Sequence, residues 1–108
     1  IDDDFFKAGR GLDNNWVLNK NQQGECSLAA VVSAQNRTME VYTTMPGLQV
    51  YTGNWVEKNT GKRGNIYDVQ HAICLETQGF PNSPNQPHFP SPILRAGSKY
   101  DEWCIYKF

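Results

Sequence analysis

A carboxylate at the end of an apolar segment is the feature of this sequence best suited to acid–base chemistry. Glu76 follows the continuous apolar run of residues 72–75 and precedes Thr77 and Gln78. An apolar wall disfavours the charged form of a carboxyl group, and this can tune the group for work as a general base or acid near neutral pH. The alternative is a glutamate at a strand end that simply reaches water. Residue type alone does not decide between the two.

Two other polar side chains stand next to apolar segments. Asp13 lies in the stretch GLDNNW at residues 11–16, where composition favours an Asx turn. Gln49 lies between apolar neighbours in PGLQVY at residues 46–51, as either a sugar-binding amide or an outward-facing strand residue. The three tryptophans offer the apolar faces on which sugars stack, although core packing is the simpler explanation for each.

The other chemically capable residues favour structural or surface roles. His71 opens the segment that carries Glu76, and strict alternation along a strand would place it on the opposite face. His88 lies in a proline-rich segment. The acidic run at residues 2–4 lacks the glycine turn and spaced oxygens of a calcium loop, so we expect a solvated stretch and no metal site. The sequence has no Ser–His–Asp order, phosphate-binding glycine loop or CxxC motif.

The elements that must position these side chains are short strands, because no window keeps apolar residues at helical spacing for three turns. Runs rich in β-branched and aromatic residues recur between Gly, Pro and Asn instead. We predict an all-β fold in which the continuous apolar run at residues 72–75 is a strand covered on both faces. Residues 81–92 hold five of the six prolines, so we expect an extended surface arm there. The expected strands are 15–19, 27–33, 38–44, 48–52, 71–77, 92–95 and 103–108.

Size and charge narrow the classes of function. The chain has 108 residues, enough for one domain, and a formal net charge of −1. It therefore lacks the broad basic field of non-specific nucleic-acid binding, and no apolar run approaches the roughly 18 residues of a membrane span. We expect neither a nucleic-acid nor a membrane partner. The chain starts at Ile1 without a leader sequence, which leaves open that it is a fragment or a processed piece.

The cysteines indicate a reducing compartment. Cys26, Cys74 and Cys104 are odd in number and have no close spacing, so they give neither a disulfide framework nor a zinc pattern. Cys74 and Cys104 lie in apolar runs, where a thiol acts as a small buried hydrophobe that reacts slowly. We expect three free thiols and a cytoplasmic location.

Three stretches of the sequence together resemble the aldose 1-epimerase (galactose mutarotase) family. They are GLDNNWVLN at 11–19, MEVYTTMPGLQVYTGNW at 39–55 and HAICLETQGFPNSPNQPHFPS at 71–91, and the last residues, from Leu94 to Phe108, also look like that family's C-terminus. The resemblance implies a large antiparallel β-sandwich of the galactose mutarotase-like supersandwich type. Residues 1–108 would form the C-terminal part of its single domain, with the N-terminal part absent.

The resemblance also implies roles for the three polar residues. Glu76 in CLETQ falls at the family's general base, Asp13 in LDNNW at a sugar-binding aspartate, and Gln49 in PGLQVYTGN at a sugar-contacting glutamine. The family's general acid is a histidine that lies earlier in the fold, and His71 and His88 do not occupy that position. Half of the implied active site is therefore missing from this chain.

The implied activity is the interconversion of the α and β anomers of galactose or glucose by ring opening and reclosure. It needs one base and one acid and no metal or cofactor. The implied partners are an aldose sugar and the missing N-terminal portion of the same fold. Two alternatives stay open: a non-catalytic sugar-binding or regulatory relative, and a bifunctional parent in which the mutarotase part follows another sugar enzyme.

Overall fold

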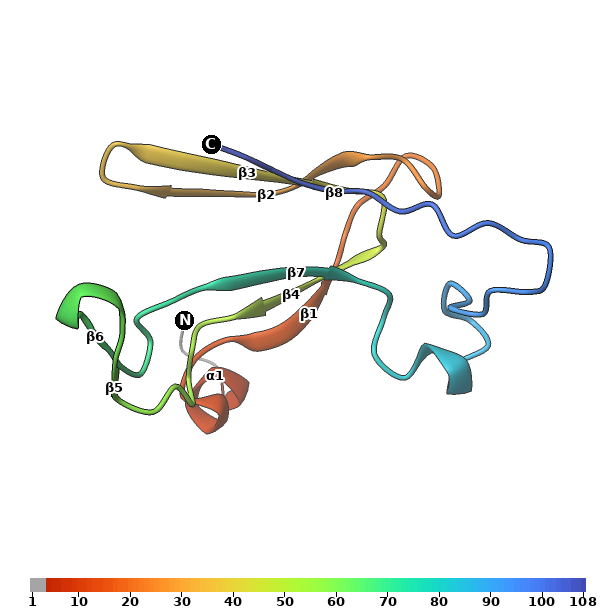
Figure 1. Ribbon diagram of the computed structural model, residues 1–108. Helices are drawn as coiled ribbons and strands as arrows, with labels where there is room; N and C mark the ends of the chain where they lie inside the picture. Colours follow the sequence, from red (N-terminus) through yellow and green to blue (C-terminus); the bar gives the residue numbers. More distant parts are fainter. Residues whose placement is uncertain (1–3) are drawn as a thin grey trace. The chain divides into compact units, whose positions relative to one another are not determined.

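The computed structural model describes residues 4–108 of the chain (Figure 1). Strands dominate it, and the α-helix of the described residues, α1 (Asp4–Gly9), has six residues. The all-β prediction is therefore confirmed. Asp4, which opens α1, is exposed, whereas Asp2 and Asp3 of the acidic run lie outside the described residues. No helix within residues 4–108 is long and apolar enough to cross a membrane.

One sheet carries all three candidate side chains. It consists of β1 (Asp13–Val17), β4 (Gly47–Tyr51) and β7 (Cys74–Gln78), in the order β1-β4-β7. The chain as a whole divides into two compact units, residues up to 14 with 49–76, and residues 15–48 with 77–108. Asp13, Gln49 and Glu76 all belong to the first unit.

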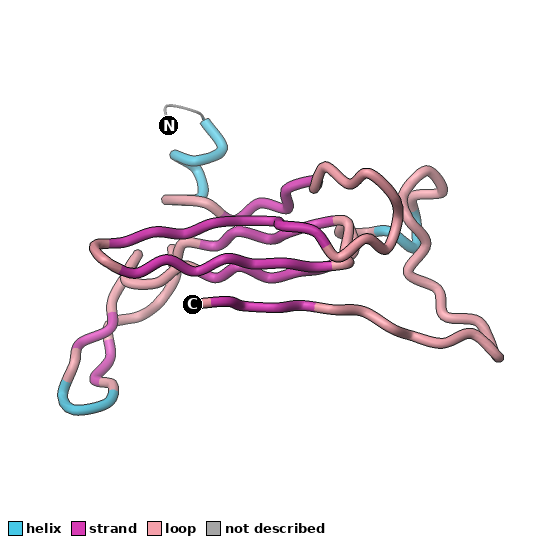
Figure 2. The backbone as a smooth tube through the Cα atoms, turned by 90° about the horizontal axis from the view of Figure 1, so that it is seen from above, coloured by secondary structure: helices cyan, strands magenta, loops and turns pink. Residues whose placement is uncertain are grey.

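The second unit contains a separate antiparallel sheet in the order β2-β3-β8 (Figures 1 and 2). A tight turn at Gln35, whose φ is 54°, joins β2 (Ser27–Ala34) to β3 (Arg37–Thr43). Strand β8 (Cys104–Lys107) pairs with the end of β3, where Val41 is fully buried. Val41 and Thr43 are buried and Tyr42 between them is half-buried, as in a strand with one covered face, and Val41 pairs with Tyr106.

The first unit also holds a small two-stranded ribbon, β5 (Asn59–Thr60) with β6 (Ile66–Tyr67), joined through the 3-10 turn η1 (Lys62–Gly64). The Tyr67 ring lies on the backbone of Gly61, where a Cβ atom would stand 1.8 Å from a ring carbon. Any larger residue at position 61 would therefore require the exposed Tyr67 ring to move.

The strand predictions are accurate for the longer strands and wrong in the proline-rich region. Residues 92–95 form no strand, because prolines at 90 and 92 remove backbone donors there. The segment 81–92 is not a purely extended arm either. It contains the 3-10 turn η2 (Ser83–Asn85), entered through a left-handed Asn82, and the Phe80 and Phe89 rings pack edge to face at 5.2 Å. Turn residues and aromatic packing thus fold the segment locally.

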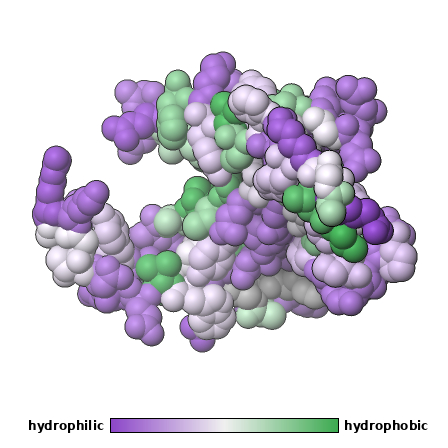
Figure 3. Space-filling view, turned by 45° about the vertical axis from the view of Figure 1, so that its right-hand side comes forward, coloured by the Kyte–Doolittle hydropathy of each residue, from purple (hydrophilic) through white to green (hydrophobic). Residues whose placement is uncertain are grey.

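The buried apolar core of the described residues is small, and consists of Val41, Leu48 and Leu75. Many large apolar side chains are exposed, and Figure 3 shows such apolar patches on the visible surface. The prediction that residues 72–75 are covered on both faces is wrong for this chain. Ala72 and Ile73 are exposed and only Leu75 of the run is buried, because β7 begins at Cys74 and none of the residues that the structure describes covers the two before it.

Candidate functional site

Asp13 and Gln49 are joined by a direct hydrogen bond. Asp13 is the first residue of β1 and Gln49 the central residue of β4, the neighbouring strand. The Gln49 Nε2 group donates to Asp13 Oδ1 over 2.7 Å. The Thr52 amide donates to the Leu12 carbonyl over 3.1 Å, which continues the pairing beyond the strand ends. The aspartate thus faces a neighbouring strand and does not serve as an isolated Asx turn.

Glu76 is the central residue of β7 and its side chain is exposed. It lies between the buried Leu75 and the half-buried Thr77. Among the residues that the structure describes, no partner holds its carboxylate by a hydrogen bond or ion pair. The carboxylate is not set against an apolar wall, which the preceding apolar run had suggested, since Ala72 and Ile73 are themselves exposed.

Two close approaches indicate how β4 and β7 are aligned. A Cβ atom on Gly47 would lie 3.2 Å from the Gln78 carbonyl oxygen, and one on Gly53 would lie 3.4 Å from the Ala72 carbonyl oxygen. From Gly47 to Gly53 the residue number rises along β4 and the residues that follow it, while the contacted residue number falls from 78 to 72. This is the pattern of an antiparallel pair. By this alignment Gln49 lies opposite Glu76, and residues directly opposite in such a pair project from the same face.

Glu76, Gln49 and Asp13 therefore form one polar row across the sheet, with the amide between the two carboxylates. Such a row can serve a polyhydroxylated ligand, since carboxylates accept hydrogen bonds from hydroxyl groups and an amide both donates and accepts. The exposed Glu76 carboxylate is also available as a proton acceptor. No chain-local pattern predicts this row, because Asp13 and Gln49 are 36 residues apart in sequence.

The two histidines belong to different units, His71 to the first and His88 to the second. His71 is exposed and precedes β7, so strand alternation does not extend to it. It lines an open hollow of about 490 Å³ together with Leu12 and Thr52, but none of the three row residues lines that hollow. His88 is exposed and its ring stands edge-on to Phe89 at 4.5 Å, in agreement with a structural or surface role.

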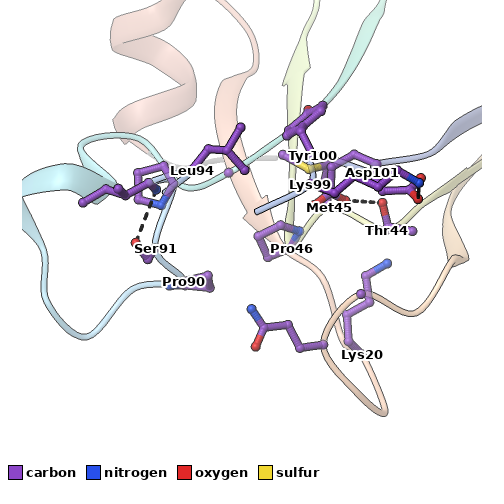
Figure 4. Close-up of a pocket in the computed structure, with 16 residues that line it drawn as sticks. Lys20, Thr44, Met45, Pro46, Pro90, Ser91, Leu94, Lys99, Tyr100 and Asp101 are labelled. Atoms are coloured by element: carbon purple, nitrogen blue, oxygen red, sulfur yellow. Dashed lines mark hydrogen bonds and ion pairs between the residues drawn. The ribbon is translucent and has the colours of Figure 1, made fainter. Parts of the chain in front are cut away.

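A second hollow, of about 440 Å³, belongs to the other unit (Figure 4). Prolines such as Pro46 and Pro90 wall it, and its charged groups are engaged: Lys99 pairs with Asp101, and the Lys20 ammonium donates to backbone carbonyls. Glu102, which also lines it, accepts a hydrogen bond from the Thr44 hydroxyl, and none of the row residues lines the hollow.

The structure also bears on metals and thiols. Within residues 4–108, no three His, Cys, Asp or Glu side chains gather closely enough to share a metal ion. All three cysteines are free thiols, as expected. Cys74 is half-buried, but Cys104 is exposed, so the expectation of a buried thiol is wrong there. The reason is that Cys104 lies on β8, an edge strand of its sheet, with every residue of the strand exposed.

Sequence reasoning missed a buried polar cluster beside Asp13. Asn54 is 1% exposed, and its side chain bonds to Thr52 and to the backbone of Leu12. The available signal was the pair Gly53-Asn54 directly after an apolar strand, where an Asn side chain commonly bonds to nearby backbone groups. That pair indicates a turn but does not reveal which strand the amide meets.

Comparison with known proteins identifies the class to which this sheet and row belong. A family model described as aldose 1-epimerase matches residues 1–107. The galactose mutarotase of Mus musculus is 40% identical over 99 residues, covering 91% of this chain and 29% of the Mus musculus protein. The galactose mutarotase of Homo sapiens gives the same identity and the same coverage. The aldose 1-epimerase of Haemophilus influenzae is 34% identical over 114 residues, covering 100% of this chain and 33% of that protein.

The chain belongs to the aldose 1-epimerase family, as its sequence motifs had indicated. Its mammalian relatives are named galactose mutarotase and its bacterial relatives aldose 1-epimerase. The chain spans about a third of the length of these relatives.

Proposed function

We propose that the protein containing these residues is an aldose 1-epimerase that interconverts the α and β anomers of galactose or glucose. The observation that carries the proposal is the polar row in which Gln49 bonds to Asp13 and lies opposite Glu76. In this proposal Glu76 is the catalytic base, and Asp13 and Gln49 bind sugar hydroxyls. The family membership of the chain supports the same assignment.

The reaction needs a proton acceptor for the anomeric hydroxyl and a proton donor for the ring oxygen. In this proposal the row supplies the acceptor. Glu76 accepts the proton of the anomeric hydroxyl as the bond between C1 and the ring oxygen breaks and the ring oxygen gains a proton. Rotation about the C1–C2 bond and reclosure then give the other anomer. Proton transfer by a positioned carboxylate contributes about 10²- to 10⁴-fold in rate. The exposed position of Glu76 leaves its carboxylate accessible to such a hydroxyl.

The proton donor for the ring oxygen comes, in this proposal, from outside residues 1–108. The chain spans about a third of the length of its relatives, and the hollow that His71 lines includes none of the three row residues. The many exposed apolar side chains, Trp16, Trp103 and Phe108 among them, suit burial by the rest of a larger β-sandwich. Residues 1–108 are thus the C-terminal part of that domain. Three free thiols suit a reducing compartment, so we place the protein in the cytoplasm.

Polarimetry of freshly dissolved α-D-galactose tests this function with the full-length protein. We expect the optical rotation to reach equilibrium faster than in buffer alone, in proportion to protein concentration. Galactose binding without any acceleration would contradict the enzyme and support a sugar-binding or regulatory relative. Absence of both binding and acceleration would reject the whole assignment.

A further inference from the structure

Asn54 is a deeply buried polar side chain close to the row, and both ends of its amide are engaged. Its Nδ2 group donates to the Leu12 carbonyl over 2.9 Å, and its Oδ1 accepts from the Thr52 hydroxyl over 2.6 Å. Only 1% of the residue is exposed. An unpaired amide at such a position would carry a large desolvation penalty, so these two bonds define where the amide can sit.

Thr52 forms hydrogen bonds with both backbone groups of Leu12, the residue before Asp13. The Leu12 amide donates to the Thr52 hydroxyl over 2.9 Å, and the Leu12 carbonyl accepts from the Thr52 amide over 3.1 Å. Both backbone groups of Leu12 are therefore held by Thr52 and Asn54. Since Leu12 directly precedes Asp13, and Thr52 follows Gln49 by three residues on the same segment, the cluster spans the two chain segments that the Gln49–Asp13 bond joins.

Gly11 shows how closely this backbone approaches the Asn54 amide. Gly11 is buried and has a φ of 148°, and a Cβ atom there would lie 2.2 Å from Asn54 Oδ1 and 2.5 Å from Thr52 Oγ1. Only glycine allows this contact. The amide is thus packed directly on residues 11 and 12, which leaves the backbone leading into Asp13 little freedom to shift.

We propose that Asn54 is a positioning residue for Asp13. With Thr52, it fixes the backbone of residues 11–12 so that the Asp13 carboxylate meets the Gln49 amide and is presented to a sugar hydroxyl. The consequence for the sugar rests on the proposed function, whereas the consequence for the Gln49–Asp13 bond does not. A merely structural role for Asn54 predicts lower stability without any specific effect on Asp13.

The substitution Asn54→Asp in the full-length protein tests the proposal, because it keeps the side-chain size but removes the donor to the Leu12 carbonyl. The control is Asn59→Asp, which removes a matching amide-to-carbonyl bond, to Glu57 over 2.9 Å, at an exposed site in the same unit. The first readout is the side-chain amide NMR signal of Gln49, identified by its loss in Gln49→Ala. We expect it to move toward the signals of exposed amides in Asn54→Asp and to stay fixed in Asn59→Asp.

The second readout is the KM for galactose. We expect Asn54→Asp to raise KM about tenfold, the loss of one hydrogen bond of ordinary strength, while kcat changes less than about threefold. In an Asp13→Ala background the same substitution should add little, because its effect passes through Asp13. An equal rise in KM in both backgrounds, or an unmoved Gln49 signal in folded Asn54→Asp, would overturn the proposal.

A second variant covers the possibility that a buried aspartate prevents folding. Thr52→Val removes the hydroxyl that accepts from the Leu12 amide, and Thr52→Ser restores it. We expect Thr52→Val to show the same changes in the Gln49 signal and in KM as Asn54→Asp. We expect Thr52→Ser to keep both near their wild-type values. Equal behaviour of the two Thr52 variants would overturn the proposal. Should the wild-type protein prove inactive while the Gln49 signal still depends on Asn54, the proposed function would fail and the positioning of Asp13 would stand.

Discussion

The Gln49 side-chain amide donates to Asp13 Oδ1 over 2.7 Å, and this bond joins two neighbouring strands on the face where Glu76 also projects. The bond orients an amide beside two carboxylates. In the proposed function Gln49 and Asp13 therefore bind the sugar as a coupled pair, separate from the carboxylate proposed to move the proton.

Replacing Gln49 by alanine should weaken sugar binding with a smaller effect on turnover. The change removes a proposed sugar contact and the amide that orients Asp13. Hydrogen bonds to charged groups contribute about 1.5–3 kcal/mol, so we expect KM for galactose to rise by about 10- to 100-fold. Gln22→Ala, at an exposed position in the other unit, is the control. Steady-state kinetics in which Gln49→Ala matches that control would contradict the binding role.

Glu40 should titrate at lower pH than an ordinary glutamate. The Lys107 ammonium, 3.0 Å from its carboxylate, and the Tyr42 hydroxyl both donate hydrogen bonds to it and lower the pKa of Glu40 below that of an ordinary glutamate. Since the folded-state pKa is depressed, this contact stabilises the fold above the unfolded-state pKa, and the contribution is lost as the pH falls through the folded-state pKa. Carboxyl NMR titration should show the midpoint moving up in Lys107→Met, and less in Tyr42→Phe. An unmoved midpoint in Lys107→Met would refute the assignment.

The three thiols should differ in reactivity in the isolated chain. Cys26 and Cys104 are exposed and Cys74 is half-buried, so a thiol reagent should modify two cysteines promptly and the third more slowly. Mass spectrometry of the partly modified chain identifies which ones. Fast modification of Cys74 with slow modification of Cys104 would disagree with the exposure of β8.

The 108-residue chain alone should show little mutarotase activity. The hollow that His71 lines includes none of the row residues, and in the proposed function the proton donor comes from outside residues 1–108. Polarimetry with the chain at micromolar concentration is the measurement. A rate near that of the full-length protein would mean that a residue of this chain, with His71 as the first candidate, supplies the proton.

The fold was predictable where the pattern is local. Short runs rich in β-branched residues identified strands such as β2 and β3 to within one residue, because such residues favour strands wherever Gly, Pro or Asn bounds them. Elements too short to show a period were not predictable, and these include α1 and the ribbon of β5 and β6. The exposure of Cys104 was missed because a sheet edge depends on strand order, which the local pattern does not contain.

The candidate site was predictable only in part. Family motifs singled out Asp13, Gln49 and Glu76, but residue types alone left each with a structural alternative. Their meeting on one face depends on the pairing of three strands far apart in sequence. The buried Asn54 cluster escaped for the same reason, since its partner Leu12 is 42 residues away.

The most direct test of the account is the substitution Glu76→Gln in the full-length protein, with turnover and galactose affinity measured together. Glutamine keeps the size of the side chain and much of its hydrogen bonding but cannot accept the proton. We expect turnover to fall by about 10²- to 10⁴-fold while affinity changes much less. Near-normal turnover in this variant would contradict the assignment of Glu76 as the base, and Asp13 would become the next carboxylate to test.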